Sequence, residues 1–171
     1  SGDWGAFFEF ISSSDDLALI HLAEPVSDVA PVPIYNGPSL GKVVRIMGRG
    51  ATGTGSEGHT LNAPRRTDLR QGYNQISVSE VRWIGYSFDN PPNALPFEAT
   101  MGSGDSGGPI LVAVGDEWHV AGIAAWKRSL VTGTDIHPGR YGETSYGVRL
   151  GNYTEWIEAT MATSGIAAES R

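Results

Sequence analysis

The chain has 171 residues, a length that fits one domain or two small ones. Its net charge is −7, from 12 basic and 19 acidic residues, and no basic cluster is larger than a pair such as Arg65-Arg66. Nucleic-acid and anionic-membrane partners are therefore not expected. Cysteine is absent, which excludes disulfides, thiol catalysis and cysteine-based zinc sites. No apolar run approaches the ~20 residues of a membrane span, and we expect neither a metal nor a cofactor.

The composition favours an all-β fold. The 23 glycines and 10 prolines, together with short apolar runs, are typical of short strands joined by turns. Five Trp, six Tyr and five Phe supply the bulk for a hydrophobic core.

The first part of the chain predicts two strands, at residues 5–11 and 16–22, separated by a polar turn. The second strand begins with Asp16, and an acid at the head of a buried strand needs a partner because an unpaired buried charge is costly. The alternative is that Asp16 is a turn residue or a cap. Residues 24–38 contain four prolines in an extended stretch, which suits a semi-rigid connector and a domain boundary.

A strand predicted at residues 42–47 leads into Gly-Arg-Gly-Ala-Thr-Gly at 48–53, which formally matches a dinucleotide-binding fingerprint. That fingerprint requires a helix to open at the third glycine. Here more glycines and a proline follow, so we reject the cofactor interpretation and expect a mobile loop with an exposed His59.

The remaining elements are read from alternation and from apolar runs. We expect strands at 73–84, 110–114, 118–126 and 146–150, a long loop at 127–143, and a short C-terminal helix with Trp156, Ile157, Thr160 and Met161 on its packing face.

Residues 104–109 (Gly-Asp-Ser-Gly-Gly-Pro) carry the strongest chemical signal. Glycines on both sides of Ser106 let the backbone approach a ligand closely, as a nucleophilic serine with backbone oxyanion donors requires. One alternative is a plain glycine-rich turn. Another is the nucleophile elbow of α/β-hydrolases, but that motif leads into a helix, whereas Pro109 and an apolar β-type run follow here.

Four segments, in order, are similar to segments of the chymotrypsin-like (trypsin-fold) serine proteases. Residues 104–109 match the family's serine motif completely, and residues 16–20 resemble the segment with its catalytic aspartate. Residues 122–126 resemble the strand that pairs with substrate, and 146–157 resemble the closing strand and C-terminal helix. The resemblance implies a double six-stranded antiparallel β-barrel of the trypsin type with a C-terminal helix, the first barrel being incomplete in this chain.

The same resemblance divides the chain. Residues 1–34 would be the remaining part of the N-terminal barrel with its connector, residues 35–163 the C-terminal barrel and helix, and residues 164–171 a loose tail.

Catalytic roles follow from the resemblance. Ser106 is the nucleophile, and Asp16 holds the catalytic histidine in the required tautomer. The N–H groups of Gly104 and Ser106 form the oxyanion hole. Asp105 pairs with the N-terminal ammonium that activation exposes in this family.

Substrate would add as a strand along Ala125, Trp126 and Lys127. Thr100 lies six residues before Ser106, at the position that resembles the floor of the specificity pocket, so trypsin-like selection of Lys or Arg is not expected. Lys127 stands where the family has glycine, and it could obstruct the pocket, attract an acidic side chain, or be an ordinary solvated lysine of the loop. Ala125 replaces the usual serine and removes one hydrogen bond near Asp16.

The catalytic histidine is the missing part, because no histidine precedes Asp16. His21, His59, His119 and His137 all follow it, in segments that do not match. We therefore hypothesise that this is the larger chain of a nicked or processed protease, secreted or periplasmic, acting on proteins or peptides. A shorter N-terminal chain would supply the histidine, the missing strands and the activation terminus. The alternatives are a catalytically inactive protease-like binding module and a serine esterase on the same fold.

Overall fold

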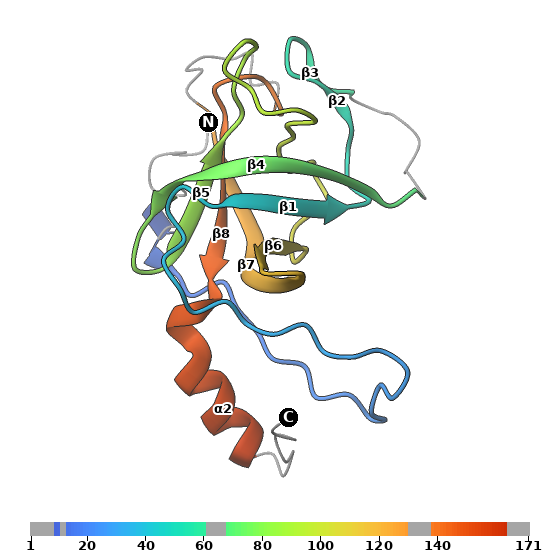
Figure 1. Ribbon diagram of the computed structural model, residues 1–171, viewed down its shortest axis with the longest axis vertical. Helices are drawn as coiled ribbons and strands as arrows, with labels where there is room; N and C mark the ends of the chain where they lie inside the picture. The colour runs from blue at the N-terminus through green and yellow to red at the C-terminus, as the bar shows by residue number, and fades with distance from the viewer. Residues whose placement is uncertain (1–8, 11–12, 61–67, 130–137, 164–171) are drawn as a thin grey trace.

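The computed structural model describes residues 9–10, 13–60, 68–129 and 138–163. Six antiparallel strands form a closed barrel in the order β1-β4-β5-β8-β7-β6, and the C-terminal helix α2 projects from one end of it (Figure 1). The barrel strands are β1 (Val43–Gly48), β4 (Arg70–Ser79), β5 (Trp83–Ser87), β6 (Pro109–Val114), β7 (Glu117–Arg128) and β8 (Thr144–Arg149). The short strands β2 (Gly53–Thr54) and β3 (Gly58–His59) pair with each other, and a 3-10 turn at Leu150–Tyr153 leads into α2 (Thr154–Thr163).

The barrel closes because β1 pairs with both β4 and β6. Arg45 lies opposite Tyr73 on one side and opposite Leu111 on the other. Closure satisfies the backbone groups that an open sheet edge would expose. Inward-facing positions alternate along the strands and form one core, whose members are Val44, Ile46, Ile76, Ile84, Tyr86, Met101, Ile110, Val112, Ala121 and Ala124.

An irregularity in the ladder between β7 and β8 concerns the site directly. Ala124 pairs with Gly147 and Trp126 pairs with Tyr146, so Ala125 falls between two paired positions. Such bulges bend a strand and redirect side chains, and they are common near active sites.

Most strands expected from the sequence are confirmed, but the one expected at 73–84 is wrong. The chain turns at residues 80–82, where Glu80 N–H donates to the carbonyl of Trp83 at 2.8 Å, and the segment divides between β4 and β5. The apolar alternation continues through the turn because Val81 is apolar although 77% exposed. At Gly53 the chain enters β2 and not a helix.

The strand expected at 16–22 is also wrong. Residues 16–32 form an extended arm that leaves the barrel and returns to it (Figure 1), and residues 16–22 pair with no strand among the described parts of the chain. An extended segment without a neighbouring strand has nothing to form a ladder with. The arm exposes several apolar side chains to solvent: Leu19, Ile20, Leu22, Val26, Val29 and Val32.

The arm is anchored at both of its ends. Near its start, Asp15 accepts a hydrogen bond from the Tyr153 hydroxyl at 2.6 Å and lies 3.3 Å from Arg82 Nε. At its far end, Tyr35 N–H donates to the carbonyl of Val120, and Val120 N–H donates to the carbonyl of Pro33.

The C-terminal helix is confirmed, but only part of its expected packing face is. Ile157 is buried, whereas Trp156 is 44% exposed. The strand expected at 5–11 and the tail at 164–171 lie wholly or largely outside the described residues. The double barrel and the incomplete first barrel stay predictions, as does the division at residue 34. No helix in the part of the chain that the structure describes has the length and apolarity needed to cross a membrane.

Candidate active site

Ser106 lies in a tight loop, residues 102–108, that leads into β6. Gly104 and Gly107 have φ values of 100° and 81°, in the left-handed region that favours glycine. Asp105 N–H donates to the carbonyl of Gly102 at 3.0 Å, and Gly108 N–H donates to that of Asp105 at 2.9 Å. The glycines therefore permit two successive turns that place Ser106 at an exposed position.

Strand β7 holds this loop in place. Gly107 N–H donates to the carbonyl of Ala124, and Ala124 N–H donates to that of Gly108, both at 2.8 Å. Ala51 N–H donates to the carbonyl of Ser103, also at 2.8 Å. The nucleophile loop is thus fixed on both sides by main-chain hydrogen bonds.

The Asp105 carboxylate points away from Ser106 and is bound by two main-chain donors. Its Oδ1 accepts the N–H of Gly50 and its Oδ2 accepts that of Gly102, each at 2.7 Å. A Cβ at Gly48 would lie 1.9 Å from Asp105 Oδ1, and one at Gly50 would lie 2.5 Å from it. The glycines that formally match a dinucleotide fingerprint therefore make room for the side chain of Asp105.

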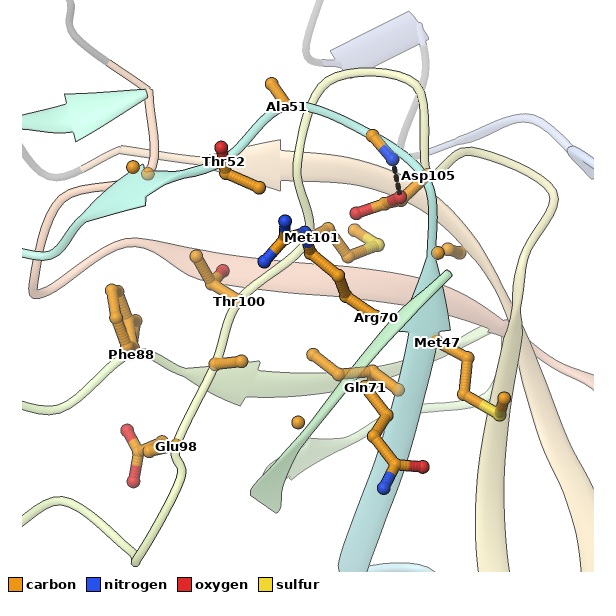
Figure 2. A pocket seen from close by; sticks show the side chains of 18 of the residues that line it. Met47, Ala51, Thr52, Arg70, Gln71, Phe88, Glu98, Thr100, Met101 and Asp105 are labelled. Atoms are coloured by element: carbon orange, nitrogen blue, oxygen red, sulfur yellow. Dashed lines mark hydrogen bonds between the residues drawn. The ribbon is translucent and has the colours of Figure 1, made fainter. Parts of the chain in front are cut away.

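Asp105 also borders a cavity of about 230 Å³, which we call the Asp105 cavity (Figure 2). Arg70 and Gln71 of β4 contribute to its lining, as do Thr100 and Met101 from the segment before the nucleophile loop. Much of the remaining lining is apolar and comes from Ile46, Met47, Tyr86, Ala99, Ile110 and Ala124.

A second cavity of about 260 Å³, the Ser106 cavity, lies beside the nucleophile. It is lined by Met101, Gly102, Ser103, Gly104, Ser106, Ala125, Trp126 and Lys127. The structure therefore brings five of the residues predicted for the site, from two distant segments, to one surface. Trp126 is fixed there by stacking on Tyr146, with ring centroids 4.1 Å apart and planes at 7°.

Three predicted site residues, Asp16, Thr100 and Asp105, do not line the Ser106 cavity, and Asp105 borders the other cavity as described above. Thr100 lines the Asp105 cavity, and its hydroxyl lies 2.7 Å from that of Ser145. Asp16 is exposed on the arm and lines neither cavity.

The predicted oxyanion donors are free to bind a ligand. Within the described ranges, the N–H groups of Gly104 and Ser106 donate to no protein acceptor. N–H groups beside an exposed serine hydroxyl can stabilise negative charge that develops on a carbonyl oxygen, where they converge on that oxygen.

Lys127 lines the Ser106 cavity, and its ammonium group has partners that the sequence did not predict. Nζ lies 3.0 Å from Glu143 Oε1 and 3.1 Å from the carbonyl oxygen of Met101. It also lies 3.4 Å from His59 Nε2. Glu143 has no recognisable signal in the sequence, because it precedes β8 in a glycine-rich loop.

His59 is half-buried, so the expectation that it is exposed was wrong. Its Nδ1 lies 3.5 Å from the hydroxyl of Ser103, and its Nε2 faces Lys127. Burial, and then the positive charge of Lys127, lower the pKa of His59 from its usual 6.5. No imidazole of the described residues lines the Ser106 cavity, and His137 lies outside those residues.

The lowered pKa predicts that His59 makes folding less favourable at acid pH. Between the lowered pKa and about 6.5, the unfolded chain binds a proton that the folded chain does not, so stability falls as the pH falls through this window. We expect the unfolding free energy of the wild type minus that of His59→Gln to decrease from about pH 8 to about pH 5, because only the wild type carries the titrating imidazole of His59. Urea unfolding of both proteins across this range measures it, and a constant difference would contradict the prediction.

Comparison with known proteins is consistent with this geometry. The family model described as Trypsin matches residues 7–157. The thrombin-like enzyme CPI-enzyme 2 of Gloydius ussuriensis is 30% identical over 170 residues, covering 91% of this chain and 60% of that protein. The snake venom serine protease gussurobin, from the same organism, is 29% identical over 161 residues, covering 86% and 54%.

One relative is named as a protease homolog: the snake venom serine protease homolog 2A of Craspedocephalus gramineus. It is 28% identical over 152 residues, covering 86% of this chain and 54% of that protein. The chain thus spans about 54–60% of the length of these relatives.

Proposed function

Because the chain belongs to the trypsin family of serine proteases, we propose that it is the nucleophile-bearing part of a serine endopeptidase. The observation that carries the proposal is the exposed Ser106, which lines a cavity together with Gly104 and Trp126. Its N–H and that of Gly104 donate to no acceptor among the described residues. A glycine-rich turn without this role would need neither the cavity nor N–H groups left without such an acceptor.

The chemistry assigned to these residues is acyl transfer. Ser106 Oγ attacks the carbonyl carbon of a peptide bond while a base takes its proton, and the N–H groups of Gly104 and Ser106 bind the resulting oxyanion. The base then protonates the leaving amine, and water hydrolyses the acyl-enzyme. Removing one oxyanion donor in a protease of this chemistry typically costs about 3–4 kcal/mol of transition-state stabilisation.

We assign the base to a histidine on a further segment of the same protease, oriented by Asp16. Two observations support this assignment. No described imidazole lines the Ser106 cavity, and the arm that carries Asp16 exposes apolar side chains, such as Ile20 at 82%, that a neighbouring barrel would cover. In this proposal residues 1–34 complete an N-terminal barrel together with a shorter N-terminal chain. The shorter chain and the present one then form a nicked or processed two-chain enzyme.

The Asp105 cavity is the proposed receptor for the activation terminus. An N-terminal ammonium would pair with the Asp105 carboxylate, which has lone pairs left after accepting two N–H groups. The apolar lining, including Ile46, Ile110 and Ala124, suits the side chain of an apolar first residue.

Substrates are proposed to be proteins or peptides that add as a strand along Ala125, Trp126 and Lys127. Ala125 lies at the bulge in β7, so its main-chain groups are outside the regular ladder. A secreted or periplasmic location is proposed because several relatives are named as venom proteases.

A second candidate function is a catalytically inactive binding module. It is favoured by two relatives whose names describe them as serine protease homologs. The complete nucleophile loop supports the enzyme, because a binding module has no need of Ser106.

Labelling with a fluorophosphonate probe, followed by intact-mass analysis, tests both proposals. The enzyme predicts one adduct on Ser106 in the native preparation, and the two-chain arrangement predicts a second polypeptide in the same preparation. Absence of the adduct would favour the binding module, and a single polypeptide would rule out the nicked form.

A further inference from the structure

The ammonium group of Lys127, a residue that lines the Ser106 cavity, is held by two oxygen acceptors. Its Nζ lies 3.0 Å from Glu143 Oε1 and 3.1 Å from the carbonyl oxygen of Met101. His59 Nε2 lies 3.4 Å from Nζ. Two of the three N–H donors of the ammonium are thus engaged, one of them by a carboxylate of opposite charge.

The pair of Lys127 and Glu143 is also shielded from solvent. The two side chains are 16% and 4% exposed, and the second carboxylate oxygen, Glu143 Oε2, accepts the N–H of Gly139. Breaking such a pair leaves an uncompensated buried charge, which is strongly unfavourable. An acidic substrate side chain in the cavity would therefore have to compete with the Glu143 carboxylate and the Met101 carbonyl for the Lys127 ammonium.

Building on the proposed protease function, we propose that the Lys127–Glu143 pair determines specificity by presenting a neutral end to the substrate pocket. The enzyme then cleaves after uncharged residues and discriminates against acidic and basic ones. The Lys127 side chain is only 16% exposed, so it is not a solvated loop lysine, and its pairing with Glu143 favours obstruction over attraction. Glu143 is the residue that decides between them, because it cancels the charge of Lys127.

Substrate profiling of the complete protease tests the proposal with matched peptides. Glutamine and glutamate have the same shape, so peptides with Gln or Glu before the scissile bond compare charge alone, as do peptides with Met or Lys. We expect kcat/KM to be at least about tenfold higher for each uncharged member. Equal values, or a preference for Glu or Lys, would overturn the proposal.

Removing the negative charge of Glu143 should make the pocket accept acidic substrate side chains. In Glu143→Gln, the Lys127 ammonium loses its carboxylate partner, so we expect the Glu/Gln ratio of kcat/KM to rise at least about tenfold. The double variant Lys127→Met with Glu143→Gln removes both charges, so its Glu/Gln ratio of kcat/KM should again be below one, as in the wild type. An unchanged ratio in a folded Glu143→Gln protein would contradict the proposal.

A readout independent of proteolysis uses the two lysines of the chain, Lys42 and Lys127. Lys42 is exposed. With an amine-reactive acetylating reagent, mass spectrometry should detect modification of Lys42 and at least about tenfold slower modification of Lys127. Equal rates would show that Lys127 is not enclosed, and the proposal would fail.

The two measurements separate the possible failures. Loss of all cleavage and of fluorophosphonate labelling would reject the protease function, while the acetylation rates still decide whether Lys127 is occupied. Cleavage with a preference for charged residues would reject the neutral pocket and leave the protease function intact.

Discussion

Replacing Ser106 by alanine is expected to abolish fluorophosphonate labelling and to lower kcat for peptide hydrolysis by about 10³–10⁶-fold in the complete protease. The reason is that Ser106 supplies the only atom that forms a bond with the substrate in the proposed mechanism. The residual rate would come from the oxyanion donors and from substrate binding. Labelling stoichiometry and single-turnover hydrolysis measure both effects.

Ser103 provides the matched control. It is exposed, lies in the same loop and borders the same cavity, and its hydroxyl contacts His59 at 3.5 Å. Ser103→Ala should retain both the label and the activity to within a few-fold. Persistence of the label in Ser106→Ala, or its loss in Ser103→Ala, would show that another serine is the nucleophile.

The second large effect is expected for Asp105→Asn. Both carboxylate oxygens accept main-chain N–H groups, from Gly50 and Gly102, whereas an amide offers one oxygen and one NH₂ group that cannot accept. Either amide orientation directs a donor at a donor. We expect a loss of about 1–3 kcal/mol in the free energy of unfolding, together with loss of hydrolysis, because the loop carrying Gly104 and Ser106 is displaced.

Asp116→Asn is the control for charge and shape. Asp116 is exposed in the turn between β6 and β7, so its replacement should change stability by less than about 0.5 kcal/mol. Urea unfolding gives the free energies, and a peptide assay gives the activity. Equal stabilities of the two variants would mean that the Asp105 carboxylate does not hold the loop.

The nucleophile loop could be predicted from the sequence because its requirements are local. The glycines around Ser106 and the apolar run after Pro109 are contiguous, and so are the residues of β7 that border the same cavity. The barrel was expected from the resemblance to the chymotrypsin-like proteases, because alternation and apolar runs locate single strands and do not specify how they pair. The turn at 80–82 was missed because alternation continues across Val81.

The remaining parts of the site depend on contacts between distant residues. Gly50 and Asp105 are 55 positions apart, and only the fold shows that Gly50 makes room for the Asp105 carboxylate. Lys127 was recognised as unusual, but its charge partner Glu143 lies in the loop before β8 and its neighbour His59 in strand β3. A pair of this kind has no periodicity or motif, so the choice between obstruction and attraction needed coordinates.

The exposed arm has a consequence for the lifetime of the protein. Proteases bind their substrates as extended strands, and the arm already has extended, solvent-exposed backbone with apolar side chains such as Ile20 and Val29. In the protease proposed above, an uncovered arm would therefore be a natural site of autolysis. Prolines at 25, 31 and 33 limit the damage, because a proline lacks the N–H that strand addition requires.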